Sequence, residues 1–166
     1  MRLLTAFAWI ALSTLSVPPT GIAAEGPSDI DFRGVAGVRV TISPMSADAT
    51  DCRLAADPLL RELEQQLTAK GLKAMPESDV VATITVLSAY EPNAGRCSSA
   101  VMLGAYRKAS FFDEDAGWLR TGHVVVWQSG LLTSSSPEQH PAGVRDALAR
   151  LGDAMALDWH RANETP

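Results

Sequence analysis

The chain has 166 residues, with 14 basic and 19 acidic side chains and a formal net charge of −5. A mildly acidic protein without long charge runs is poorly suited to nucleic acid or anionic membrane partners, because both select clusters of Lys and Arg. The length suffices for one hydrophobic core and is too short for two ordinary domains.

Residues 1–24 have the layout of a secretory signal peptide. Arg2 precedes an uncharged run from Leu3 to Val17, which is followed by two prolines and small residues. Cleavage is expected near Ala23 or Ala24, and no cysteine lies close enough to serve as a lipid anchor. A retained transmembrane anchor is the alternative, but the run is shorter than the roughly 20 residues that a spanning helix needs. We therefore expect a periplasmic protein with no membrane insertion after cleavage.

The exported part is expected to hold a flexible arm, a single domain and one disulfide. Residues 25–34 are mostly polar and contain a proline, and residues 35–162 are predicted to form one α/β domain. Cys52 and Cys97 are the only cysteines, and because exported proteins meet oxidising conditions, we predict that they pair. A redox or metal-binding role is disfavoured, since they lack CxxC spacing and have no adjacent histidine.

The first half of the domain predicts a strand, a helix and a second strand. Apolar and polar residues alternate over 37–43, and leucines then recur at helical spacing over 51–70, where Gly71 supplies the stop. Within that helix, Asp57-Pro58 is either the N-cap and first-turn proline or a break after a short turn. Period-2 alternation resumes over 80–90.

The second half predicts a long hairpin and a closing helix. A turn is expected at 93–99, a strand up to residue 112, a loop at 113–117 and a strand over 118–135. An amphipathic helix follows over 141–162. The order β-α-β-β-β-α predicts an α+β fold, a two-layer sandwich with two helices on one face of an antiparallel or mixed sheet.

Markers of metal binding are weak in this sequence. The three histidines, His123, His140 and His160, lie apart, and none begins an H-x-x-x-H or H-E-x-x-H motif. The acidic loop at 113–115 could hold calcium, but it lacks the alternating ligand spacing of a calcium loop, and a solvated turn is the better interpretation. We expect no metal and no cofactor.

Aromatic side chains along the predicted hairpin form a candidate interface. They are Tyr106, Phe111, Phe112, Trp118 and Trp127. Alternation should turn some of them outward, and an exposed aromatic patch beside a sheet edge would suit a protein partner or an added strand. Ordinary core packing with cross-strand pairing is the alternative, and the pattern supports it at least as well.

The element order, with a Gly-x-Val-Val-Val-Trp stretch (Gly122, and Val124 to Trp127) and a closing amphipathic helix, resembles small periplasmic domains of envelope assembly proteins. These are the curli-secretion lipoprotein, the Pel exopolysaccharide lipoprotein and the N-terminal domain of TolB. The resemblance covers about residues 35–160 and implies an envelope-associated α/β domain. Those lipoproteins carry a lipid-modified cysteine, which this chain lacks.

The function expected from the sequence is a non-catalytic, exported binding or assembly module that contacts an envelope protein or polymer. The first alternative is a small-ligand-binding protein that uses the space between sheet and helices. The second is a small periplasmic hydrolase, although the serine-hydrolase motif G-x-S-x-G is absent. Its residues would be Ser98, Ser99, His123, Asp113 and Glu91.

Overall fold

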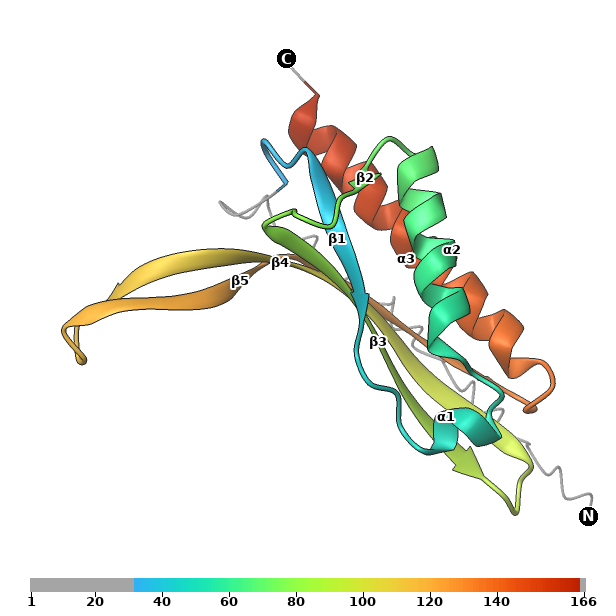
Figure 1. The fold of residues 1–166 in the computed structure, drawn as a ribbon. Helices are drawn as coiled ribbons and strands as arrows, with labels where there is room; N and C mark the ends of the chain where they lie inside the picture. Colours follow the sequence, from blue (N-terminus) through green and yellow to red (C-terminus); the bar gives the residue numbers. More distant parts are fainter. Residues whose placement is uncertain (1–31, 165–166) are drawn as a thin grey trace, which may run out of the picture.

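A five-stranded sheet in the order β2-β1-β3-β4-β5 carries the fold of residues 32–164, which the computed structural model describes (Figure 1). The predicted signal peptide and residues 25–31 lie outside the described residues. In chain order the elements are β1 (Gly37–Ile42), α1 (Asp48–Asp51), α2 (Ala56–Ala69), β2 (Lys73–Ala74), β3 (Val80–Glu91), β4 (Arg96–Asp113), β5 (Trp118–Ser135) and α3 (His140–Asn163).

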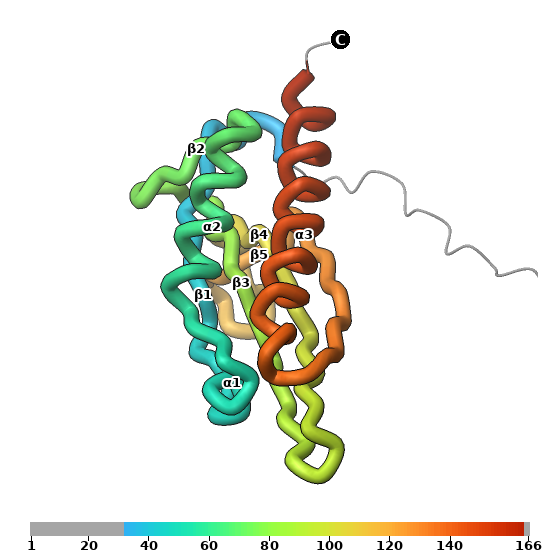
Figure 2. The backbone as a smooth tube through the Cα atoms, turned by 90° about the vertical axis from the view of Figure 1, so that its right-hand side faces the viewer, coloured from blue at the N-terminus to red at the C-terminus, as the bar shows by residue number. Residues whose placement is uncertain are grey.

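The sheet is mixed, and the two long helices lie on one of its faces. β1 runs parallel to both β2 and β3, whereas β3, β4 and β5 are antiparallel neighbours. Figure 2 shows α2 and α3 side by side in front of the strands. The predicted α+β two-layer sandwich, with its helices on one face of a mixed sheet, is confirmed. We call this face the helix-covered face and the opposite one the outer face.

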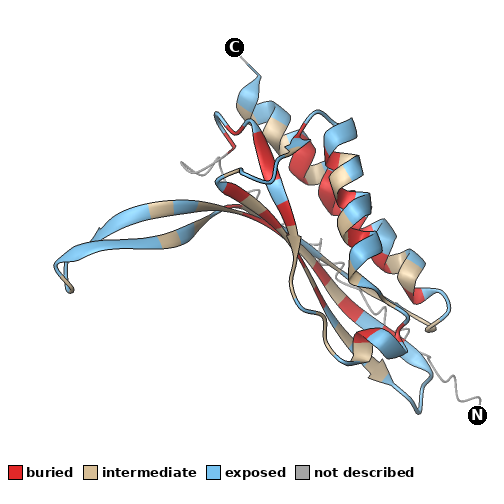
Figure 3. Cartoon of the chain, in the orientation of Figure 1, coloured by how far each residue is buried: buried red, intermediate tan, exposed pale blue. Residues whose placement is uncertain are grey.

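The core fills the space between the helices and the sheet (Figure 3). Along β3, Val80, Ala82, Ile84 and Val86 alternate inward and are almost fully buried. The helices contribute the stripes that their periodicity predicts. Their largest buried members are Leu59, Leu63, Leu67, Val144, Leu148, Leu151 and Met155.

The helix predicted over residues 51–70 is divided in two. A one-turn helix, α1, ends at Asp51, and α2 begins only at Ala56, with Pro58 in its first turn, where a proline is tolerated. Between them Arg53 adopts a left-handed conformation with φ of 57°, which no α-helix continues through. Each interpretation of Asp57-Pro58 is therefore correct in part: a break does follow a short helix, but it lies before Asp57, and Pro58 is a first-turn proline of α2, whose N-cap is Ala55.

The turn predicted at residues 93–99 is shorter than expected. β4 already begins at Arg96, and Gly95 closes the turn with φ of 57°. Ser98 and Ser99 therefore belong to the strand, although serine is common in turns. Their hydroxyl groups are satisfied within the sheet region, since Ser98 Oγ lies 2.9 Å from Ser134 Oγ and Ser99 Oγ lies 2.7 Å from a ring nitrogen of His140.

The two ends of the described chain meet. Phe32, which the sequence analysis placed in the flexible arm, is buried in the core. Its carbonyl oxygen accepts a hydrogen bond from Asn163 Nδ2 at 2.9 Å, and Gly34 N donates to Asn163 Oδ1 at 3.0 Å. Trp159 Nε1 also donates to the carbonyl oxygen of Val35 at 2.7 Å. Residues 32–34 thus belong to the folded domain rather than to a flexible arm.

Candidate functional site: the β4–β5 hairpin

β4 and β5 extend far beyond the strand that supports them. β3 pairs with β4 from Glu91 opposite Arg96 to Val80 opposite Arg107, and there β3 begins. Residues 108–113 of β4 pair with β5 as far as the turn, and Lys108 N also donates to the carbonyl oxygen of Asp79 at 3.2 Å. We call residues 108–123 the hairpin extension. In Figure 1 it projects away from the layer of helices.

Both faces of the hairpin extension carry exposed apolar side chains. The pairing of Asp113 with Trp118 and of Phe111 with Arg120 puts Phe111 and Trp118 on one face. Phe112 pairs with Leu119 on the other face. The exposed fraction is 62% for Trp118, 60% for Phe112 and 73% for Leu119, and Phe111 is half exposed. The alternation therefore separates apolar pairs onto two faces without burying either pair.

Local contacts hold the hairpin extension in a defined shape. The Phe111 ring lies across Gly122, where an added Cβ would come within 3.1 Å of Phe111 Cε1. Arg120 Nε lies 2.8 Å from Asp113 Oδ2, and Ala116 N donates to Asp113 Oδ1 at 2.9 Å. Gly117, with φ of 73°, completes the turn. Asp113 thus shapes the turn and pairs across the strands, consistent with the predicted solvated loop.

The other two aromatic residues of the candidate interface lie elsewhere. Tyr106 is half-buried on the outer face, where its ring covers Gly104 closely enough that a Cβ there would lie 2.6 Å from the hydroxyl oxygen. Trp127 is half-buried against the core, and its Nε1 donates to Asp158 Oδ2 of α3 at 2.9 Å. Only Phe111, Phe112 and Trp118 of the predicted set lie on the hairpin extension.

A β-bulge explains why Trp127 faces the helices. Ala105 pairs with Trp127 and the next residue, Tyr106, with Val125, so that Val126 is an extra residue in β5. Two successive residues at a bulge can point to the same side of the sheet. Val126 is accordingly buried in the core, and Trp127 packs against it.

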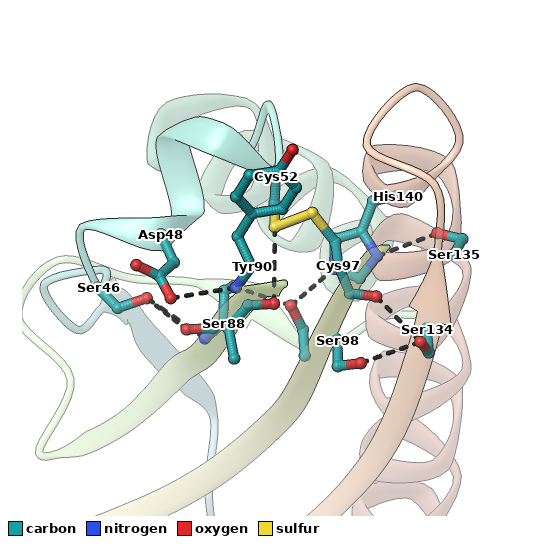
Figure 4. Close-up of a disulfide and its surroundings, with 12 residues drawn as sticks. Ser46, Asp48, Cys52, Ser88, Tyr90, Cys97, Ser98, Ser134, Ser135 and His140 are labelled. Carbon is teal, nitrogen blue, oxygen red and sulfur yellow. Dashed lines mark hydrogen bonds between the residues drawn. A yellow bond between two sulfur atoms is a disulfide. The ribbon is translucent and has the colours of Figure 1, made fainter. Parts of the chain in front are cut away.

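A buried histidine joins three strands at the other end of the hairpin (Figure 4). His140, the first residue of α3, is fully buried. Its Nε2 lies 2.7 Å from Ser99 Oγ of β4, and its Nδ1 lies 3.0 Å from Ser135 Oγ of β5. Ser99 Oγ in turn lies 2.8 Å from Ser88 Oγ of β3. We call these four residues the histidine cluster.

The histidine cluster is a closed hydrogen-bond network. Burial lowers the pKa of His140 below its usual range, so the imidazole is held neutral and both ring nitrogens are bonded to hydroxyl groups. Ser99 is itself buried, and the partner that orients His140 through Nδ1 is Ser135 rather than a carboxylate. The arrangement fixes the start of α3 against the sheet.

The residues named for a hydrolase are not gathered into one place. Ser99 contacts His140 instead of His123, which pairs with Lys108 in the hairpin extension. Asp113 lies at the tip of that extension. Ser98 lies near the start of β4, and Glu91 pairs with Arg96 at the opposite end of the hairpin from Asp113.

The predicted disulfide is present. Cys52, just after α1, is bonded to Cys97 in β4, with their Cα atoms 5.8 Å apart. It lies beside the histidine cluster, as Figure 4 shows. Nearby, Tyr90 N donates to Asp48 Oδ2 at 3.1 Å, so α1 is also held to β3 by a hydrogen bond.

Three further observations concern the rest of the described chain. Over residues 32–164, no group of three or more His, Cys, Asp or Glu side chains is placed to hold a metal ion. None of the helices in this range is long and apolar enough to cross a membrane. His160, near the end of α3, lies with Nε2 2.7 Å from the carbonyl oxygen of Lys70 and so caps α2.

Comparison with known proteins finds similarity at the level of structure. No known protein family matches the sequence, and no curated protein matches it. The fold is similar to that of the PelC dodecamer from Paraburkholderia phytofirmans, at 14% identity and a TM-score of 0.44, over 78% of this chain and 89% of that one. A second crystal form of PelC gives 12% identity and a TM-score of 0.43, over 76% and 91%.

A third solved structure, that of an uncharacterised protein, is 11% identical with a TM-score of 0.38, over 77% of this chain and 92% of that one. PelC is the Pel exopolysaccharide lipoprotein to which the sequence was likened, and that weak resemblance is confirmed. It is a likeness of fold.

The histidine cluster was not predicted from the sequence, although a signal for it was present. His140 precedes Val144, Leu148, Leu151 and Met155 at helical spacing, and all four are buried. A histidine that continues an apolar stripe is expected to be buried and to need hydrogen-bond partners for both ring nitrogens. The neighbouring run of serines at 134–136 offers such partners.

Proposed function

We propose that the chain is a non-catalytic, exported binding or assembly module that contacts an envelope protein through the hairpin extension. The observation that carries this proposal is the exposure of Phe112, Trp118 and Leu119 on a ribbon that has no core beneath it. Large apolar side chains gathered on a surface mark interaction sites in soluble proteins, and aromatic residues dominate the binding energy of many interfaces.

The construction of the hairpin supports a role in recognition. A two-stranded ribbon alone is marginally stable in water, but here it continues two strands that are anchored in the sheet. The Asp113–Arg120 ion pair and the close packing of Phe111 on Gly122 further restrain it. A restrained ribbon loses less conformational entropy on binding than a flexible loop, and the same contacts therefore give a higher affinity.

The distribution of the apolar residues favours a partner that encloses the ribbon. Phe111 and Trp118 lie on one face, and Phe112 and Leu119 on the other, so a flat surface would cover only one pair. A cleft in a protein can contact both faces. This geometry is why we name a protein partner ahead of a polymer.

The proposal is tested by crosslinking and capture of the exported chain from its native periplasm. Two double variants, Phe111→Ser/Trp118→Ser and Phe112→Ser/Leu119→Ser, each remove one face of the ribbon. Leu157→Ser, at a half-exposed site on α3, is the matched control outside the hairpin. We expect each double variant to lose a recurrent envelope protein and the control to keep it.

Thermal unfolding separates recognition from folding in the same variants. Because the substituted side chains are exposed, we expect midpoints within about 5 °C of the unsubstituted protein. Capture that survives both double variants would contradict the proposal. Loss of capture together with a large fall in the midpoint would show that the aromatic residues stabilise the fold, which would also count against it.

A further inference from the structure

The free edge of β5 is the longest unpaired backbone in the described part of the sheet. β5 ends the strand order, and its 18 residues pair on one side with β4 only. At the opposite edge of the sheet, β2 has just two residues. A long edge strand presents unpaired N–H and C=O groups that can pair with another strand.

Two usual protections of an edge strand, charged side chains and prolines, are missing from the second half of β5. Residues 124–136 contain no charged side chain and no proline. Natural edges are commonly blocked by lysines, prolines, bulges or short length. The bulge at Val126 interrupts the edge, and it leaves a continuous, uncharged stretch over residues 127–135.

Leu132 lies in the middle of this stretch and is 87% exposed. It pairs with Ala100 on the outer face, and the next residues of β5 on that face, Gly130 and Ser134, are small. A surface hollow of about 330 Å³ opens beside it, lined by Ser98, Ser99, Ala100, Leu132, Thr133 and Ser134. An apolar side chain brought to the edge would cover Leu132 and enter this hollow.

We infer that the free edge of β5 pairs antiparallel with the same edge of a second copy of this chain, about a two-fold axis at Leu132. A two-fold axis perpendicular to the sheet puts each residue opposite one of its copy, and residues opposite each other share a face. The two Leu132 side chains then lie together on the outer face, each beside the hollow of the other copy. By symmetry, Leu132 of the second copy is the apolar side chain that covers Leu132 of the first copy.

The rest of the stretch is compatible with this register. Leu131 lies opposite Thr133 of the second copy, and Gly130 lies opposite its Ser134, so small or uncharged residues meet at each position. The helices of both copies remain on the same side of one continuous sheet. The hairpin extensions are outside the paired stretch, so the inference goes beyond the proposed function and does not depend on it.

The test is the association state of the full exported chain, purified from the periplasm with its disulfide intact. Sedimentation over a range of concentrations should show a dimer that dissociates on dilution, because a single pair of edges buries little surface. Leu132→Lys places two lysines opposite each other and should raise the dissociation constant on the order of tenfold or more. Leu119→Lys, at an exposed site on the hairpin extension, should leave dimerisation unchanged while weakening partner capture.

A photo-crosslinking residue at position 132 identifies what lies against the edge. In a mixture of isotope-labelled and unlabelled chains, the expected product joins two β5 peptides, one from each chain. A monomer at every concentration, or a dimer that Leu132→Lys does not weaken, would overturn the inference. A crosslink from position 132 to another protein would also overturn it, because the edge would then pair with a strand of that protein. An assembly of more than two copies that depends on Leu132 would overturn it as well.

Discussion

The two halves of the β4–β5 hairpin are built from the same strands but have opposite surroundings. In the half next to β3, Val101, Leu103 and Ala105 are buried beneath the helices. In the hairpin extension, Phe111, Phe112 and Trp118 continue the apolar character of the strands and are exposed. The difference begins where β3 begins, because Val80 is its first residue and pairs with Arg107.

This contrast shows that an apolar residue in a strand is core or surface according to what packs on it. Alternation decides which face a side chain occupies, and tertiary contacts decide whether that face is covered. The supported half derives stability from burial, whereas the hairpin extension contributes surface. Substitutions should therefore affect stability in one half and recognition in the other.

The largest expected effect comes from the covalent bond in the supported half. Replacing both Cys52 and Cys97 with serine should lower the free energy of unfolding by about 4 kcal/mol, because the bond closes a loop with a sequence separation of 45. Denaturant unfolding measures this loss. Removing the disulfide should cost the same free energy in a chain whose residues 109–122 are replaced by a two-residue turn, because the effects of changes at distant sites add. A smaller loss in the shortened chain would show that the two halves are coupled.

A pair of substitutions within β4 compares the halves directly. Leu103→Ala removes a fully buried side chain and should cost about 3 kcal/mol of unfolding free energy, through lost burial and the cavity that remains. Phe112→Ala removes a larger side chain that is 60% exposed, and should cost less than about 1 kcal/mol. Chemical denaturation at one pH gives both values. Similar costs at the two positions would refute the contrast between the halves.

The smallest expected effect is on the free energy of unfolding at acidic pH. Because burial lowers the pKa of His140, the unfolded state takes up a proton more readily than the folded state. The free energy of unfolding should thus fall as the pH drops below about 6.5, by at most about 1.4 kcal/mol per pH unit, until the pKa of the folded protein is passed. His140→Gln should remove this part of the pH dependence. His123→Gln, in the hairpin extension, is the control, and identical profiles for the two variants would contradict the prediction.

Much of the fold follows from local patterns in the sequence. The last strand was predicted over residues 118–135 and is observed there, because Gly117 and Pro137 bracket a β-rich run. The disulfide could be predicted from the number of cysteines and from the expectation of export. The division of the first helix depends on the left-handed conformation of Arg53, which its residue type does not predict.

The candidate site was only partly predictable, because its features depend on non-local pairing. The bulge at Val126 turns Trp127 toward α3, against the alternation on which the sequence argument relied. The point at which β3 begins determines that Phe112 is exposed, and nothing within β4 indicates it. The contact of Ser99 with His140 also depends on non-local pairing, and the hydrolase alternative had named His123 instead.

The hydrogen bonds of Asn163 to Phe32 and Gly34 bring both ends of the described chain to one corner of the molecule. That corner lies well away from the tip of the hairpin extension (Figure 1). An affinity tag or a surface attachment at either end would leave the ribbon free to reach a partner. Such a layout also suits circular permutation, because a short linker could join the ends while new termini open in the turn at residues 92–95.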